Sequence, residues 1–485
     1  MGDNLKEKMV GALKWSTVDR LGQQAVQFAI GVVLARLLSP DDFGLIGMIM
    51  IFAALSYVIV DSGFGQALIR RKDANETDFN TVFYFNLASS LIIYAVLFFA
   101  APLIADFFSQ PQLKNLSRVI FLAVIFNSLY LVQFAQLNRS MDYKKLAKIN
   151  IFSTILSGTT GVVLAYTGFG VWSLVWQQVL FHLFRFIFSY FMVGWRPSAI
   201  FSFSVINEMW RFSINLLGTS VLNVIFNYIY ILILGKYYPK SEVGYYVQGN
   251  KLNETFIFTF QSILIGSSYA MFSHIQHDEE RFRRILREMS QKTAMITLPV
   301  LLTMIVVAAP LIEVVWSAKF LASVPYFRFL CLAGLFLPLY SLNITALNAR
   351  GESRTTFRIE MFKKAMILLS VFIAFPYGIE AMLWGYAASS ILAYVVSLIQ
   401  IKKNLTHYLT HQFQDVYLSL VAGLVIATAV FFVGLIPLQV HLMLTLQLLV
   451  AAVLYLIIVR LLFPELFRKV LHALRQKIGK NNRAF

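Results

Sequence analysis

Apolar runs long enough to cross a bilayer recur from one end of this chain to the other. A membrane-spanning helix needs about 20 mostly apolar residues, whereas an outer-membrane barrel shows alternating strands of about ten. Only 13% of the 485 residues are charged, against about a quarter in an average soluble protein. The sequence therefore predicts an all-α polytopic membrane protein with about 14 transmembrane helices.

The predicted spans are joined by short loops, and no loop is long enough for a soluble domain. Their approximate ranges are 15–37, 43–63, 81–105, 116–138, 149–167, 170–193, 209–235, 243–268, 291–312, 325–348, 360–376, 379–400, 415–436 and 440–463. The last twenty or so residues are basic, and we expect them to lie on anionic lipid headgroups.

The net charge of +17 raises the question of a nucleic-acid partner. The basic residues gather in short loops between spans, as cytoplasmic Lys and Arg do in membrane proteins, so no nucleic acid is expected. By the same rule both termini of this multi-pass protein are cytoplasmic. The loops assigned to the cytoplasm include Arg139–Lys148 and Arg350–Lys364, and Lys236–Glu242 is assigned to the opposite side.

Catalytic and metal-binding motifs are missing from the sequence. There is no Gly-rich phosphate loop, no HExxH and no nucleophile elbow. The single Cys331 excludes a disulfide framework and a cysteine-based metal site. The first apolar run has no cleavage site after it, so it is predicted to be a retained span. We expect no enzyme activity, no cofactor and no metal.

An internal repeat is visible at an offset of 200 residues, where LARLLSPDDFGL (34–45) matches LGKYYPKSEVGY (234–245). Asp42 falls on Glu242 and Gly44 on Gly244, and the loops 137–145 and 347–358 also correspond. Internal repeats of this kind are common in transporters. The prediction is an N-terminal six-helix lobe (1–208), a C-terminal six-helix lobe (209–403), and two extra helices with the basic tail (404–485).

Polar residues form stripes on several predicted spans. In the first span Asp19, Arg20, Gln23, Gln24 and Gln27 fall within one arc of about 140°. Since charged groups at membrane depth cost at least a few kcal/mol, they indicate a wet cavity between the lobes. The candidate substrate-binding residues are Asp19, Arg20, Gln23, Gln27, Arg185, Arg211, Asn215, Asn223, Asn227, Lys251 and Glu254.

Several candidates also have a structural explanation. Asp19 and Arg20 lie near a span end, where they could cap or snorkel, and Arg185 could also snorkel. Lys251 and Glu254 could be an intrahelical pair, and the asparagines at 215, 223 and 227 could join helices. The candidates for coupling to a proton or sodium ion are Asp19, Asp61 and Glu254.

Four segments resemble the polysaccharide transporter (Wzx-type) flippases, which are related to MATE multidrug exporters and lipid II flippases. They are LARLLSPDDFGLIGM, DSGFGQALIRR, DFNTVFYFN and LNRSMDYKK. The resemblance implies two six-helix lobes related by a pseudo-two-fold axis around a central cavity. It also implies a substrate, an undecaprenyl-pyrophosphate-linked oligosaccharide, that crosses to the periplasmic leaflet by alternating access for the synthesis of O-antigen, capsule or exopolysaccharide.

The residues suit that substrate. Arg20 and Lys251 can meet the pyrophosphate, with Asp19 and Glu254 holding them in the empty site, while amide side chains meet sugar hydroxyls. The expected partners are this polyprenyl pyrophosphate, membrane lipids, and the polymerase and glycosyltransferases of the same pathway. The alternatives are a MATE-like drug or metabolite antiporter, an envelope polymerase or ligase, and a flippase for lipid II or a teichoic-type polymer.

Overall fold

The computed structural model describes residues 2–71, 73–264, 268–404 and 408–462, and these residues contain helices and no strands. The basic tail predicted to lie on lipid falls outside the described residues. The chain divides into two compact units, Met1–Gln248 and Gly249–Phe485, and each is described by itself. The lobes predicted at 1–208 and 209–403 remain a prediction that rests on the sequence repeat.

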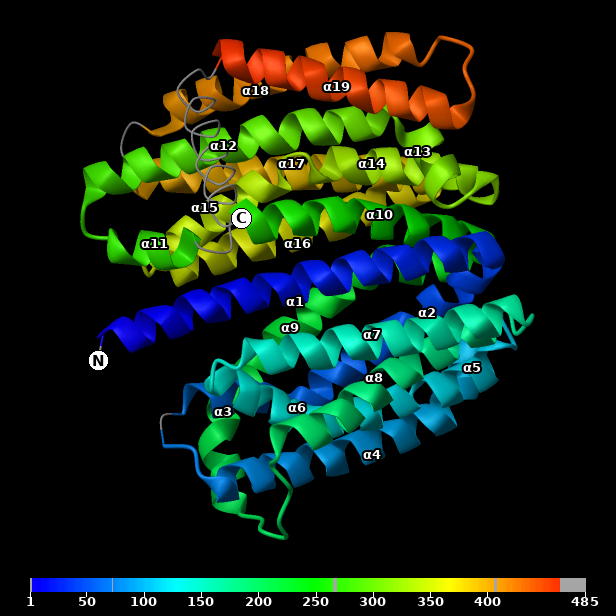
Figure 1. Cartoon of the computed structure of the whole chain (residues 1–485), viewed down its shortest axis with the longest axis vertical. Helices are drawn as coiled ribbons and strands as arrows, with labels where there is room; N and C mark the ends of the chain where they lie inside the picture. Colours follow the sequence, from blue (N-terminus) through cyan, green and yellow to red (C-terminus); the bar gives the residue numbers. More distant parts are fainter. Residues whose placement is uncertain (1, 72, 265–267, 405–407, 463–485) are drawn as a thin grey trace, which may run out of the picture. The chain divides into compact units, whose positions relative to one another are not determined.

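Helices of the first unit are long, and only two of them have fewer than nine residues (Figure 1). They are α1 (Gly2–Leu37), α2 (Pro40–Asp61), α3 (Phe64–Arg70), α4 (Glu76–Phe107), α5 (Leu113–Ile120), α6 (Leu122–Arg139), α7 (Tyr143–Tyr166), α8 (Val171–Val193), α9 (Phe203–Tyr237) and the start of α10 (Lys240–Leu264).

The second unit holds the remaining elements. They are α11 (Ser268–His274), α12 (Glu279–Val306), α13 (Ala308–Val315), η1 (Ala318–Ser323), α14 (Val324–Gly334), α15 (Leu337–Ala349), α16 (Ser353–Ala374), η2 (Phe375–Tyr377), α17 (Ile379–Asn404), α18 (Tyr408–Val433) and α19 (Val440–Leu462).

The prediction of an all-helical polytopic membrane protein is confirmed. In the described residues, 11 helical segments are long and apolar enough to cross a membrane. Three more predicted spans coincide with α1, α10 and α16, which are long enough but carry more polar side chains. The count of fourteen is consistent with this, because long but polar helices are expected where a membrane protein has a wet interior.

Several helices begin at side chains that bind their free N–H groups. The Ser39 hydroxyl accepts from the Asp42 N–H, while Asp42 accepts from the Ser39 N–H at 2.9 Å, which completes a capping box before α2. Asn75 and Asp78 form the same motif before α4. A side-chain cap of this kind contributes about 1 kcal/mol. The loop sequences that mark the repeat and the third span therefore fix where helices start.

Within the first unit, α7 packs along both α1 and α8, α6 packs on α8 and α4, and α2 packs on α9. Small polar residues join some of these helices, as where Ser90 of α4 lies 2.9 Å from Ser128 of α6. Phe64 and Leu68 of the short α3 are fully buried against α4, α6 and α9. The α2–α3 turn is therefore anchored to the core.

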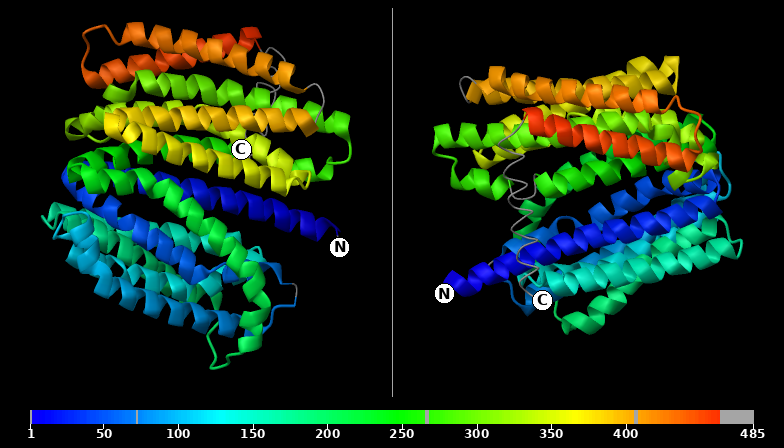
Figure 2. Two further views of the ribbon diagram at one scale, coloured as in Figure 1. Left: turned by 180° about the vertical axis from the view of Figure 1, so that it is seen from behind. Right: turned by 45° about the horizontal axis from the view of Figure 1, so that its top comes forward.

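Within the second unit, α12 packs along α18, and α18 pairs with α19 (Figure 2). The Asn343 amide donates to the Ser397 hydroxyl at 3.0 Å, which joins α15 to α17. The Tyr340 hydroxyl donates to Glu360 of α16 at 2.6 Å. Helices α18 and α19 thus belong to the same compact unit as α12.

Helices α2 and α10 approach closely at their first turns, where the sequence repeat is strongest. A Cβ atom added at Gly44 would overlap the carbonyl oxygen of Lys240, and one added at Gly244 would overlap that of Pro40. Lys240 also forms an ion pair with Asp41 at 3.2 Å. The two matched glycines are therefore required because the backbones touch there.

This contact predicts the effect of a single methyl group. Gly44→Ala should lower stability by about 1–3 kcal/mol, because the backbones must separate to admit a Cβ atom. Gly218→Ala is the matched control, since a Cβ atom there has nothing within 4 Å. The measurement is the thermal unfolding temperature of the purified protein in detergent. A Gly44→Ala protein as stable as Gly218→Ala would contradict the close approach.

Candidate functional site

Asp19 is the centre of a buried polar network in the first unit. Its side chain is 7% exposed, although it belongs to the polar stripe of α1. Gln23, one turn later, donates its amide N–H to the carboxylate at 2.7 Å. Asn150 of α7 donates to both carboxylate oxygens at 3.2 Å. The carboxylate is thus held by two neutral amides, one from its own helix and one from α7.

Asn150 also connects this carboxylate to a cation. Its side-chain oxygen accepts from Arg185 Nε of α8 at 3.1 Å. The Arg185 guanidinium lies 4.0 Å from the ring centre of Tyr130 and 5.2 Å from that of Phe181. Since an amide can donate and accept at the same time, one asparagine satisfies opposite charges from α1 and α8.

The polar face of α8 continues beyond Arg185. His182, one turn earlier, is 6% exposed, and its ring centre lies 5.0 Å from that of Tyr57 of α2. Asp19, Gln23 and Arg185 were predicted as site residues, and the structure brings these three together. Asn150 was not predicted, because it closely follows the basic residues of 144–148 and has the appearance of a span end in the sequence.

Other predicted residues of the first unit have accessible side chains and lie along α1 and α9. Asn215 donates to the Arg211 carbonyl at 3.2 Å and Thr219 donates to the Asn215 carbonyl at 3.1 Å, so these bonds stay within α9. The exposed members of the predicted site are Arg20, Gln27, Arg211, Asn215, Asn223 and Asn227. The network around Asp19 is therefore separate from a set of accessible polar groups.

Lys251 and Glu254 belong to the second unit and are both exposed. Glu254 accepts from the Asn250 amide at 2.9 Å, one turn earlier in α10. Both acids expected to hold a cation, Asp19 and Glu254, thus accept hydrogen bonds from amide side chains. Their roles toward Arg20 and Lys251 remain predictions. No three His, Cys, Asp or Glu side chains of the described ranges lie close enough to hold a metal ion.

Asp61 is the last residue of α2. Its Oδ1 accepts from the N–H of Gly65 at 3.3 Å across the turn that leads into α3. This bond lies inside the DSGFG sequence that helped to carry the family resemblance. It gives that sequence a structural role in closing the turn.

Comparison with known proteins agrees with this architecture. A family model described as polysaccharide biosynthesis protein matches residues 33–325, so the chain belongs to that family. The structure is similar to a lipid II flippase in an inward closed conformation, with a TM-score of 0.75, 13% identity, and 93% of this chain and 99% of that chain covered. It is also similar to an inward-facing MATE multidrug transporter, with a TM-score of 0.64, 16% identity, and 80% and 95% covered.

The names of curated relatives also refer to polysaccharide biosynthesis. The teichuronic acid biosynthesis protein TuaB of Bacillus subtilis is 23% identical over 83% of this chain and 85% of its own length. The succinoglycan biosynthesis transport protein ExoT of Rhizobium meliloti is 24% identical over 81% and 80%. The lipopolysaccharide biosynthesis protein WzxC of Escherichia coli is 24% identical over 76% of each chain. The predicted resemblance is confirmed.

The Asn150 bridge predicts a measurable loss of stability. Asn150→Leu leaves the buried Asp19 carboxylate and Arg185 without their shared partner, which should cost about 1–3 kcal/mol. Ser153→Ala, one turn along α7, is the control, because Ser153 donates only to the Ile149 carbonyl of its own helix, at 2.7 Å. Thermal unfolding of both purified variants tests this. Equal loss in the two would refute the bridging role.

Proposed function

We propose that this protein is a flippase that moves an undecaprenyl-pyrophosphate-linked oligosaccharide across the inner membrane by alternating access. The support is membership in a polysaccharide biosynthesis family, together with a fold shared with a lipid II flippase and MATE transporters. The names of TuaB, ExoT and WzxC point to surface polysaccharides as the product of the pathway. Pathway glycosyltransferases and the polymerase would be its functional partners.

One observation carries this proposal beyond family membership. Accessible cations and neutral amides lie on three long helices that coincide with predicted spans, with Arg20 on α1, Lys251 on α10 and asparagines along α9. Cations suit a pyrophosphate, and amides suit sugar hydroxyls. A cavity for cationic drugs would favour accessible acids, so the MATE-like antiporter is the less favoured alternative. A polymerase or ligase is disfavoured because the long extramembrane loop typical of such enzymes is missing from the sequence.

We propose Arg20 and Lys251 as the groups that meet the pyrophosphate, because both side chains are accessible. Arg185 is assigned a supporting role, since its Nε is bound to Asn150 and its guanidinium stacks on Tyr130. Ion coupling is assigned to the acids Asp19, Asp61 and Glu254 as candidates. Asp19 has the most enclosed position of the three.

Replacing the two cations should block export. Each charge-assisted hydrogen bond contributes about 1.5–3 kcal/mol, so Arg20→Ala or Lys251→Ala should reduce polymer export by about 10- to 150-fold. The measurement is complementation of a strain that lacks the transporter, with membrane abundance checked. Lys292→Ala is the control, because Lys292 forms only a surface pair with Glu288 of its own helix, at 3.4 Å. Full export by the Arg20→Ala, Lys251→Ala double variant would move the phosphate site to Arg185 and Arg211.

The proposed orientation places both termini and the α6–α7 loop in the cytoplasm. Lys145, in the first turn of α7 next to that loop, has a side chain that is 47% exposed, so Lys145→Cys should react with a thiol reagent only when the cytoplasmic side is open. The natural Cys331 is buried and would be replaced by Ala to give a clean background. Labelling of residue 145 by an impermeant reagent in cells with an intact inner membrane would reverse the orientation.

A further inference from the structure

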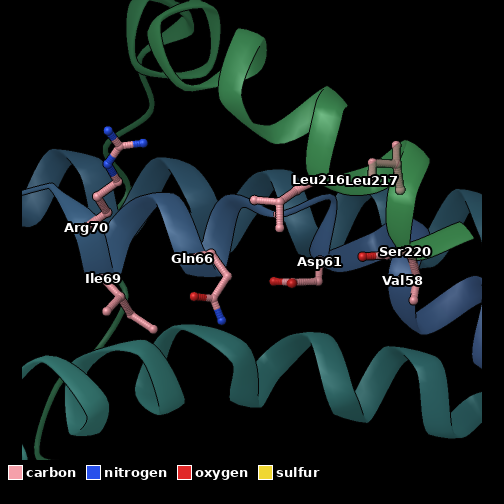
Figure 3. Close-up of a pocket in the computed structure, with 9 residues that line it drawn as sticks. Val58, Asp61, Gln66, Ile69, Arg70, Leu216, Leu217 and Ser220 are labelled. Carbon is pink, nitrogen blue, oxygen red and sulfur yellow. The ribbon is translucent and has the colours of Figure 1, made fainter. Parts of the chain in front are cut away.

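A second polar site lies in the first unit where α2 ends, α3 begins and α9 passes by (Figure 3). It is a cavity of about 430 Å³. Figure 3 shows Asp61 and Gln66 on the same side of the α2–α3 segment, with Ser220 of α9 beside Asp61. The cavity is lined by Val58, Asp61, Gly63, Gln66, Ile69, Arg70, Leu216, Leu217 and Ser220.

The two glycines of the DSGFG sequence shape this cavity. Gly63 has φ +77°, and a Cβ atom there would lie 3.2 Å from Leu216 Cβ, so glycine lets α9 come close to the turn. Gly65 donates its N–H to Asp61 Oδ1, and a Cβ atom at Gly65 would lie 2.7 Å from that oxygen. The sequence therefore folds the Asp61 carboxylate back over the start of α3 while leaving its second oxygen free to bind.

Short as it is, α3 is held firmly. Arg139 of α6 donates to the Leu68 carbonyl at 3.3 Å and to the Arg71 carbonyl at 2.5 Å. The Arg71 side chain pairs with Asp78 of α4 at 3.4 Å and with Glu208 of α9 at 2.9 Å. Of the two consecutive arginines, Arg71 is thus structural, while Arg70 lies on the cavity wall. Such bracing is what a preformed binding site requires.

The cavity offers both donors and acceptors that the protein does not use. Asp61 Oδ2, the Gln66 amide and the Ser220 hydroxyl have no hydrogen-bond partner anywhere in the described ranges. A carboxylate only accepts, an amide also donates, and a hydroxyl does both. Beside them stand apolar side chains of Val58, Ile69 and Leu216. This mixture fits a neutral ring that carries hydroxyl groups around its edge and C–H groups on its faces.

Other ligand classes fit less well. A divalent cation such as calcium takes six to eight oxygen ligands, whereas this wall supplies one carboxylate. A phosphate group would meet the Asp61 carboxylate with like charge. The cation on the same wall, Arg70, does not offset this, because its side chain points to the opposite side of α3 from Gln66 (Figure 3). The volume falls within the range of about 300–1,000 Å³ that is usual for small-molecule sites. A single sugar ring therefore satisfies both the size and the polarity of the cavity.

We propose that this cavity is a saccharide subsite, in which Asp61, Gln66 and Ser220 bind the hydroxyls of one sugar ring of the cargo. The identity of the cargo rests on the proposed function, whereas sugar binding itself does not. In this subsite the Asp61 carboxylate accepts hydrogen bonds from sugar hydroxyls, and Leu216 packs against the ring. None of its lining residues belongs to the Asp19–Asn150–Arg185 network or to the cations assigned to pyrophosphate.

The test measures sugar binding to the full-length protein in nanodiscs. Ligand-observed saturation-transfer NMR would use D-glucose, D-galactose and N-acetyl-D-glucosamine at about 20 mM, since one ring is expected to bind with millimolar affinity. At least one of them should receive saturation from the wild-type protein. Asp61→Asn should weaken its binding about tenfold, because a hydrogen bond to a charged group is lost. Asp106→Asn, an exposed carboxylate in the last turn of α4, is the matched control.

Thermal unfolding checks that each variant is folded. If Asp61→Asn is not folded, Ser220→Phe replaces it, because the phenylalanine side chain would fill the cavity from α9. Absence of saturation transfer from all three sugars to the wild-type protein would overturn the proposal. Unchanged sugar binding in the folded variants would also overturn it. If these variants at the same time lost the stabilisation that sodium gives the wild-type protein, the cavity would be assigned to a cation.

Export in the complementing strain separates this proposal from the proposed function. Export without any sugar binding overturns the subsite and leaves the flippase. Sugar binding that depends on Asp61, in a protein that does not restore export, overturns the flippase and leaves the subsite.

Discussion

Hydrocarbon offers no hydrogen-bonding partner, so every polar side chain at membrane depth must find one within the protein or face water. Many hydroxyls here meet this demand locally. Thr154 and Thr297 each donate to the carbonyl four residues earlier, at 2.8 Å. Asp19 cannot do so, because a carboxylate only accepts. Besides Gln23 of its own helix, the first unit brings an asparagine from α7 to it, and this asparagine connects α1, α7 and α8.

The use of an amide between the charges has a physical consequence. A direct Asp–Arg ion pair in a low-dielectric interior must recover the desolvation cost of both ions through one contact. Asn150 instead gives each charge a neutral partner, and the aromatic rings of Tyr130 and Phe181 take the face of Arg185. The network can thus stay intact without the accessible cation Arg20, which has no hydrogen bond to it in the described residues.

Much of the fold was predictable because span length and loop charge are local properties of a sequence. The polar stripe of the first span also predicted Asp19 and Gln23 as members of one site. Asn150 was not predicted, since a single asparagine beside basic residues carries no periodic signal. Its role depends on partners in α1 and α8, which the sequence does not show to be near it. The cavity at Asp61 was not predicted for a similar reason. Its wall includes Leu216 and Ser220, which are more than 150 positions from Asp61 in the sequence.

The contact between Gly44 and Gly244 is isologous, because each glycine meets the carbonyl oxygen four residues before the other. Such self-complementary contacts are the rule between identical subunits of a symmetric dimer. The first turn of α2, with Pro40 and Gly44, and the first turn of α10, with Lys240 and Gly244, therefore play equivalent parts in this contact. Because the sequence repeat places matching residues on the two sides of this contact, one ancestral segment that was duplicated explains both sides of it.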